Sequence, residues 1–455
     1  MKNKKILAID IGTSSVKAAL IGKKGQIFAH ERISLVKVSG ASYKDKWLFD
    51  SYRWISAIKK LCAGMDFGEV AALCVTGHGP SIVPVKKNGK ATGPALMWNK
   101  PVEQRGYKSA YLPRIEWYVD NTLFAEKPDF FLGVPEFVSF YLGAEPVMFS
   151  PSPEFDSLIW SYEEKKASGL EEYLPVGIAR TGNLCGLTGN SAKALGIPAS
   201  IPVVAGASDF IMAIVGCNVL TERKVCNRAG TSEGINFALS MPCKLDGIRN
   251  TPHPAEGLYN AGLVIPASGS IFEWFKNLTG RSSVSYLEIV KHAEKLWDKN
   301  WLKRKGPFIF PHNKGGVTDA SFGDFVGLDS SFSPDVVFAA LLESLLFMVR
   351  DAFSVFYSAE VYPSDIVLCG GQALNMPWVR ARADVLGRTI SVPSICDAEL
   401  AGAAAYSFLA LGDFSSLYDA ASSVFSVRTM VSPSEEKVDF WNKAYQYYSS
   451  FRYSS

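Results

Sequence analysis

The sequence predicts an α/β protein built from two domains. At 455 residues, the chain is too long for one compact hydrophobic core. Apolar runs followed by small and polar residues recur along it, and open α/β sheets place their sites at such strand ends. In addition, a Gly-Thr-Ser loop occurs in each half, at residues 12–14 and 230–232, which indicates a duplicated unit.

The individual elements follow from apolar patterning. Short apolar runs bounded by turn residues predict buried strands at residues 5–9, 16–21, 70–75, 201–205 and 365–369. Residues 334–356 contain no Pro or Gly after Pro334 and show helical apolar spacing, which predicts one long, largely buried helix. The pattern breaks at residues 241–247, so we place the domains at 1–240 and 241–455.

Composition excludes several classes of protein. Hydrophobic residues make up 48% and charged residues 20%, which excludes general disorder. The net charge of +3 gives no reason to expect nucleic-acid binding. No stretch of about 20 uncharged apolar residues occurs, and the apolar run before Asp10 is too short for a signal core, so we expect no membrane association. The eight cysteines lack zinc-knuckle or CxxC spacing, which favours a reducing, cytoplasmic setting.

Asp10 is the first residue suited to chemistry. A carboxylate at a strand end before a Gly-Thr-Ser turn can hold a hydrated Mg²⁺ ion, and the turn can receive phosphate oxygens. Lys17 can add a positive charge to the same phosphates. The alternative is an aspartate that caps its own turn.

Asp209 is the second, and it lies between two apolar runs. Partial desolvation there would make its carboxylate a better proton acceptor. In the alternative interpretation, Ser208 or Asp209 caps the helix that follows.

Two further segments combine residues suited to binding. His78 lies between glycines after a buried strand, and the Trp98-Asn99 pair offers the apolar platform and amide of a polyol site. Gly370-Gly371 allows close backbone approach to a ligand. A structural histidine and an ordinary strand-to-helix turn are the alternatives. Neither GxGxxG nor GxxxxGK[ST] occurs in the sequence.

Taken in order, these segments resemble the FGGY family of carbohydrate kinases, within the actin-like and hexokinase-like ATPase superfamily. ILAIDIGTSSVKAAL and NRAGTSEGINFAL resemble the two phosphate motifs, and IPVVAGASDFIMAIVG resembles the segment with the catalytic aspartate. VTGHGPSIVPVKKNGKATGPALMWN resembles the sugar-binding strand and loop of xylulose kinases. IVLCGGQALNMPWVRARADVLGRTISVP resembles the adenosine motif, and AELAGAAAYSFLALG resembles the helix after it.

The resemblance implies two ribonuclease H-like domains with a central cleft, and phosphorylation of a small sugar or polyol by ATP with Mg²⁺. It implies that Asp209 is the general base and that Asp10 supports the metal. The implied sugar site comprises Gly77, His78, Trp98, Asn99 and Asp209. The implied ATP site comprises Thr13, Ser14, Lys17, Gly230, Thr231, Gly269, Gly370, Gly371 and Asn375. The family is also the ground for expecting a homodimer.

Four departures from the family pattern bear on the substrate. Lys100 stands where xylulose kinases usually have Asp, residues 105–137 are shorter, residues 314–319 replace the GERTP loop, and Arg380 replaces a common Gln. A ketopentose such as xylulose is expected, with glycerol, ribulose and gluconate as alternatives. Lys100 would favour an acidic sugar if it borders the pocket, or it points to solvent. A catalytically quiet sugar- or nucleotide-binding regulator is the remaining alternative.

Overall fold

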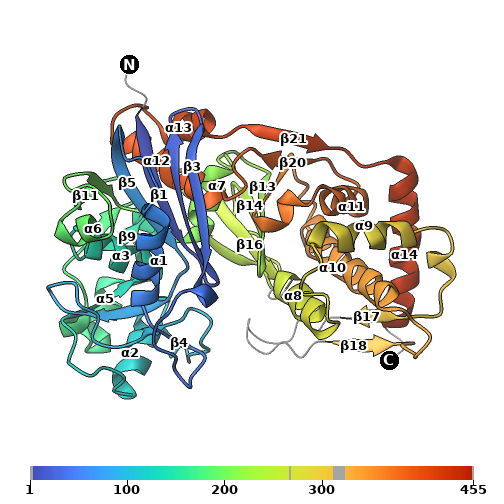
Figure 1. Ribbon diagram of the computed structural model, residues 1–455, viewed down its shortest axis with the longest axis horizontal. Coiled ribbons are helices and arrows are strands. Elements are labelled where there is room, and N and C mark those ends of the chain that lie inside the picture. The colour runs from blue at the N-terminus through green and yellow to red at the C-terminus, as the bar shows by residue number, and fades with distance from the viewer. Residues whose placement is uncertain (1–3, 266–267, 311–322, 453–455) are drawn as a thin grey trace. The chain divides into compact units, whose positions relative to one another are not determined.

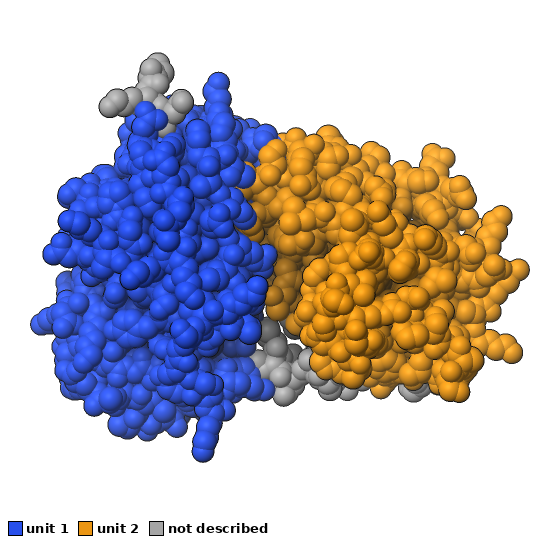
Figure 2. All heavy atoms as spheres, in the orientation of Figure 1, with its two compact units in different colours: residues 1–220, 252–256, 398–426 blue, residues 221–251, 257–397, 427–455 orange. Residues whose placement is uncertain are grey.

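The computed structural model describes residues 4–265, 268–310 and 323–452 (Figure 1). The altered loop at residues 314–319 lies outside the described residues. Packing divides the chain into two units (Figure 2). Unit 1 comprises Met1–Leu220, Pro252–Glu256 and Ala398–Ser426, and unit 2 comprises Thr221–Thr251, Gly257–Asp397 and Val427–Ser455.

These units differ from the sequential domains expected from the sequence. A late segment of the chain, which contains α12, packs within unit 1 against β1, β5 and α7. A division by packing does not test the domain limits along the chain, so 1–240 and 241–455 stay a prediction.

Unit 1 is built on a six-stranded sheet with the order β11-β12-β5-β1-β2-β3. Its strands are β1 (Lys5–Ile11), β2 (Ser15–Gly22), β3 (Ile27–Ser34), β5 (Val70–Gly77), β11 (Leu184–Leu187) and β12 (Pro202–Val204). Strand β1 pairs antiparallel with β2, and β2 with β3, whereas β5 runs parallel to β1 and to β12.

The two faces of β1 have different neighbours. Leu7, Ile9 and Ile11 pack in the core that also contains Trp54 of α1 (Tyr52–Cys62) and Phe137 of α3 (Val134–Leu142). Successive side chains of a strand alternate between faces, so the side chain of residue 10 lies on the opposite face. That face is covered by α12 (Ala398–Ala410), which packs against α7 (Asp209–Gly216) (Figure 1).

The remaining elements of unit 1 form smaller layers. A four-stranded sheet has the order β4-β7-β6-β8, and a two-stranded sheet joins β9 and β10. Their bounds are β4 (Leu48–Phe49), β6 (Ile82–Val85), β7 (Ala95–Leu96), β8 (Phe130–Gly133), β9 (Met148–Ser150) and β10 (Ile178–Arg180). The other helices are α2 (Leu112–Asp120), α4 (Pro153–Ile159), α5 (Tyr162–Ser168), α6 (Asn190–Ala194) and α13 (Leu417–Val424).

Unit 2 is built on a seven-stranded sheet with the order β15-β16-β14-β13-β19-β20-β21. Its strands are β13 (Lys224–Ala229), β14 (Glu233–Leu239), β15 (Arg249–Pro252), β16 (Tyr259–Ile265), β19 (Asp365–Cys369), β20 (Ile390–Pro393) and β21 (Val427–Val431). Strands β16, β14 and β13 are antiparallel neighbours, and β19 and β20 continue the sheet in parallel with β13. The run β3-β2-β1-β5-β12 of unit 1 has the same pattern of strand directions, which is the pattern a duplicated unit would have.

The helices of unit 2 pack on this sheet and on one another. They are α8 (Ser268–Leu278), α9 (Tyr286–Leu296), α10 (Pro334–Tyr357), α11 (Met376–Leu386) and α14 (Glu435–Arg452), beside the hairpin β17 (Phe308–Phe310) and β18 (Asp324–Val326). Helix α10 begins with Pro334 after Ser333, whose side chain accepts a hydrogen bond from the Val336 amide. Its length confirms the predicted long helix. Among the described residues, we find no helix with the length and apolar character needed to cross a bilayer.

Candidate active site

Three segments of unit 1 bring predicted site residues to one edge of the sheet. Strands β1 and β5 pair in parallel, so Asp10 and His78 lie at the same edge. A parallel bridge joins Gly77 to Ser208, directly before Asp209. The negative charge of Asp209 raises the pKa of both Asp10 and His78, although it is not the largest influence on either. The predicted metal-supporting carboxylate, sugar-site histidine and general base therefore lie near one another within unit 1.

The environment of Asp10 raises the pKa of its carboxyl group. Asp10 is 2% exposed, and its Oδ1 has no hydrogen-bond partner within the described residues. Burial raises the pKa of Asp10 to about 7, and the charges of Glu399 and Asp209 add to that increase. Lys17 acts in the opposite direction, because its Nζ lies 3.1 Å from Asp10 Oδ2.

Lys17 is held between two buried carboxylates. It stands directly opposite Asp10 in the β1–β2 pairing, and its Nζ also lies 3.9 Å from Oε2 of Glu399. Glu399 belongs to the first turn of α12 and is 4% exposed. The expected contact between Lys17 and phosphates stays a prediction, because in this structure the ammonium group pairs with Asp10 and Glu399.

The donors around Asp10 fit a hard divalent cation. Mg²⁺ prefers one or two carboxylates together with water and phosphate oxygens. Asp10 presents a buried carboxylate oxygen with no hydrogen-bond partner in the described part of the chain, and Asp209 adds a second carboxylate nearby. Such an arrangement is costly unless a proton or a cation neutralises it.

Asp209 is the first residue of α7, and its side chain is half-buried. Ser208 occupies the N-cap position, but its side chain makes no capping hydrogen bond. Ser208 is therefore the N-cap residue by position only, without a capping side-chain bond, and Asp209 lies where the ends of β5 and β12 converge.

His78 is buried and uses one ring nitrogen in a hydrogen bond. It is 3% exposed, and its Nδ1 lies 2.8 Å from Oγ of Ser81. Burial lowers the pKa of His78 to about 4, so the ring is neutral at pH 7. Its Nε2 is buried and has no hydrogen-bond partner among the described residues. A substrate hydroxyl would satisfy this atom.

Two side-chain hydroxyls and a buried arginine hold Trp98 in place, and Asn99 follows it in the chain. The Trp98 amide donates to Oγ of Ser81 at 2.7 Å, and its indole Nε1 donates to Oγ1 of Thr13 at 3.0 Å. Arg114 donates to the carbonyl of Trp98 at 2.7 Å. Asn99 Oδ1 is buried without a hydrogen-bond partner in the described residues. The indole hydrogen bond therefore links Trp98, a predicted sugar-site residue, to the exposed loop that contains Thr13.

The predicted nucleotide residues of unit 2 form a second cluster. Gly230 and Thr231 lie in the turn between β13 and β14, the position that Thr13 and Ser14 occupy between β1 and β2. The amide of Gly269, at the start of α8, donates to the Thr231 carbonyl at 3.1 Å. A Cβ atom at Gly269 would collide with the Gly230 carbonyl oxygen, so this close approach requires glycine.

The turn after β19 carries the other predicted nucleotide residues. Gly370 has φ 85°, and an added Cβ would press on the Ala229 carbonyl, so glycine is required. Gly371 is exposed, and Asn375 Nδ2 donates to the Tyr286 carbonyl at 3.2 Å. Because β13 and β19 are parallel neighbours, this turn lies at the same sheet edge as Gly230.

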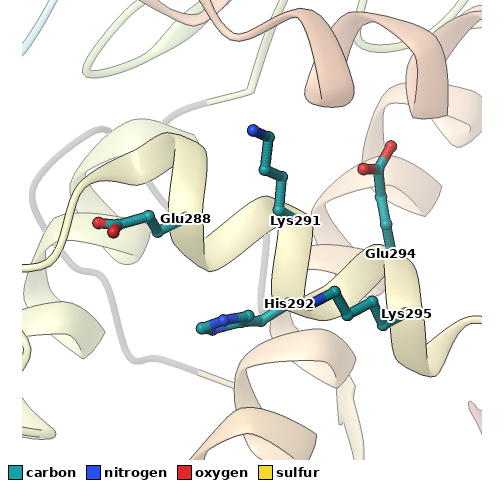
Figure 3. A pocket seen from close by; sticks show the side chains of 5 residues that line it. All are labelled: Glu288, Lys291, His292, Glu294 and Lys295. Atoms are coloured by element: carbon teal, nitrogen blue, oxygen red, sulfur yellow. The ribbon is translucent and has the colours of Figure 1, made fainter.

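A shallow depression on the surface of unit 2 is lined by none of the predicted nucleotide residues. It is lined by Glu288, Lys291, His292, Glu294 and Lys295, all on α9. Figure 3 shows Lys291 and Glu294 projecting from one side of the helix, whereas His292 projects from another. These side chains do not converge on a common point, as a binding site would require.

Two models of one family match most of this framework. The N-terminal domain of the FGGY family of carbohydrate kinases matches residues 5–107, and its C-terminal domain matches residues 225–411. Together they cover more than half of the chain. The chain belongs to the FGGY family of carbohydrate kinases. It is accordingly an ATP-dependent carbohydrate kinase.

This FGGY kinase is similar to xylulose kinases along most of its length. The xylulose kinase of Escherichia coli (strain K12) is 24% identical over an alignment of 429 positions, and the match covers 84% of this chain and 85% of that protein. The crystal structure of ligand-bound xylulose kinase from Lactobacillus acidophilus has a TM-score of 0.79 at 17% identity, covering 99% of this chain and 98% of its own. Gluconate kinase from Lactobacillus acidophilus has the same TM-score and identity, covering 100% and 98%. The likeness confirms the expected fold of two α/β domains.

Sequence reasoning missed four residues that contact predicted site residues within their own unit. Ser81 and Arg114 gave no signal, because a serine and an arginine are ordinary in mixed segments. Glu399 had one, since it is the only charged residue within the apolar run 398–410. Gln372 stood in the adenosine motif, but its partners are distant in sequence.

Proposed function

We propose that this kinase transfers the γ-phosphoryl group of ATP to a hydroxyl of a ketopentose such as xylulose. The observation that carries the proposal is the proximity of Asp10, His78 and Asp209 at one sheet edge in unit 1. The similarity to xylulose kinases supports a ketopentose as the acceptor.

Orientation of the sugar would depend on buried polar atoms that lack partners in the described chain. His78 Nε2 and Asn99 Oδ1 are two such atoms. Leaving a buried polar atom unsatisfied costs about 1–3 kcal/mol, so polyol hydroxyls that hydrogen-bond to both would bind favourably. The Trp98 indole supplies a flat apolar surface beside them.

Proton transfer would be the task of Asp209. As the substrate oxygen bonds to the γ-phosphorus, its proton passes to the Asp209 carboxylate, the bond to the β–γ bridging oxygen breaks and ADP leaves. Mg²⁺, when bound with the support of Asp10, would neutralise charge on the β- and γ-phosphates. Lys17 and Glu399 would keep the Asp10 side chain in place.

The assignment of the nucleotide residues rests on the family motifs. Thr13, Ser14 and Lys17 in unit 1, and Gly230, Thr231, Gly269, Gly370, Gly371 and Asn375 in unit 2, remain the predicted ATP contacts. A homodimer and a cytoplasmic location likewise stay predictions.

The test is a coupled assay of ADP production with ATP, Mg²⁺ and a panel of pentoses, hexoses, polyols and sugar acids. We expect a ketopentose to give the highest kcat/KM, and Asp209→Asn to lower kcat by several orders of magnitude with the fold intact. Wild-type turnover in the Asn variant would refute the assignment of the base. ATP binding without turnover of any sugar in the panel would favour the alternative of a catalytically quiet, ligand-binding regulator.

A sugar acid is the second candidate, and it rests on the charge of Lys100 beside the predicted sugar residue Asn99 in the sequence. Lys100 is half-buried and follows Asn99, and its Nζ lies 4.6 Å from the centre of the Trp117 ring, so the side chain packs on protein. A neighbouring ammonium group would favour a carboxylate-bearing substrate, and gluconate kinase shares the fold. Gluconate in the same panel separates the candidates.

A further inference from the structure

The side chain of Gln372 joins three segments of unit 2. It belongs to the short helix Gly371–Leu374 that follows β19. Its Nε2 donates to the Gly230 carbonyl at 3.1 Å and to Oγ of Ser268 at 3.2 Å. The turn after β19, the turn between β13 and β14, and the start of α8 therefore meet at one amide.

The other end of the same amide is equally occupied. Gln372 Oε1 accepts from Trp378 Nε1 at 2.9 Å and from Arg382 Nη2 at 2.7 Å. An amide has two N–H donors and two acceptor positions, and all four are in use. The Gly230 carbonyl can only accept and the Trp378 indole can only donate, so the partners determine which way the amide faces.

Arg382, which donates to the Gln372 amide, is itself held in a buried ion pair. Arg382 is 1% exposed and binds both carboxylate oxygens of Glu233, which is 0% exposed. Arg382 also donates to Asn227 Oδ1 at 3.2 Å, and Asn227 Nδ2 donates to Glu233 at 2.7 Å. Asn227 and Glu233 lie on β13 and β14, on either side of the Gly230–Thr231 turn, so the network is rigidly attached to that turn.

We propose that Gln372 is a positioning residue for the nucleotide, which holds the turn expected to bind adenosine in register with the turn expected to bind phosphates. This inference rests on the proposed assignment of both turns to ATP. Preorganised turns do not have to be ordered when the ligand binds, so the benefit falls on ligands that span both of them. A ligand that touches one turn gains little.

The variant Gln372→Glu separates the two ends of the amide. A carboxylate still accepts from Trp378 and Arg382, but it cannot donate to the Gly230 carbonyl and places one oxygen against another. We expect the Kd of a non-hydrolysable ATP analogue, measured by calorimetry, to rise about 10- to 100-fold. The Kd of adenosine should change less than about threefold, because adenosine does not reach the phosphate turn.

Matched variants separate positioning from general damage. Leu374→Ala, in the same short helix, alters an exposed side chain and should leave both constants unchanged. Gln372→Asn keeps the amide but shortens the reach, so it should show the same selective loss to a smaller degree, and it replaces the Glu variant if that protein does not fold.

The outcomes distinguish this inference from the proposed function. A wild-type protein that binds neither the analogue nor adenosine would contradict the assignment of the turns to ATP. A wild-type protein that binds both, with Gln372 variants that lose neither or lose both equally, would overturn the positioning role alone.

Discussion

Replacing Arg382 by Met is expected to destabilise unit 2 by about 3–5 kcal/mol, the usual cost of removing one partner of a buried ion pair. The structure places this case at the costly end, because Glu233 is fully buried. After the substitution, its carboxylate would keep the Asn227 amide as a donor at 2.7 Å but would lose the opposing charge. Gln372 would also lose a donor to its Oε1.

A double-mutant cycle separates the ion pair from packing. Wild type, Arg382→Met, Glu233→Gln and the double variant would be compared by amide hydrogen exchange in β13 and β14, which reports the free energy of opening unit 2 itself. The double variant has no uncompensated buried carboxylate. Its loss of opening free energy should therefore be about 1–3 kcal/mol smaller than the sum of the losses in the two single variants. Additive losses would refute the reasoning, as would a loss below about 1 kcal/mol for Arg382→Met.

Three further predictions concern unit 1. Burial raises the pKa of Glu136 from 4.5 to about 7, so its contribution to stability should fall as pH rises through that interval. The free energy of unfolding of Glu136→Gln and of wild type would be measured in urea at pH 4.5 and 7.5. Relative to wild type, the variant should be up to about 3 kcal/mol more stable at pH 7.5 than at pH 4.5, and an equal difference at both pH values would contradict this. Trp98→Phe removes the hydrogen bond to Thr13 but keeps a flat ring. In steady-state assays, the KM for the sugar should rise about fivefold, while the thermal stability of the variant stays normal. An unchanged KM would argue against a role of Trp98 in binding. If the substrate is a sugar acid, Lys100→Met should lower kcat/KM for gluconate by about tenfold or more and leave xylulose unaffected; equal effects on both would exclude charge recognition.

Local pattern was enough to predict the strands that lead into the site. Apolar runs ending in small or polar residues identified β1, β5, β12 and β19, and with them the positions of Asp10, His78 and Asp209. Such runs carry their own signal, because a buried strand needs consecutive apolar residues and its end needs residues that tolerate a turn.

The supporting contacts could not be predicted in this way. Lys17 meets Glu399, and Gln372 meets the Gly230 carbonyl, across long stretches of chain. Such pairs are decided by which strands become neighbours, and no local spacing records that choice. The return of α12 to unit 1 is of the same kind: it is a long-range packing event, and it moved the packing units away from the expected domain limits.

The most direct test of the central claim is a ³¹P NMR spectrum of ATP, Mg²⁺ and xylulose incubated with the kinase. The account predicts that a phosphomonoester signal grows in step with ADP for the wild-type protein and stays absent with Asp209→Asn. ADP accompanied only by inorganic phosphate, or an equal phosphomonoester signal from the Asn variant, would contradict it.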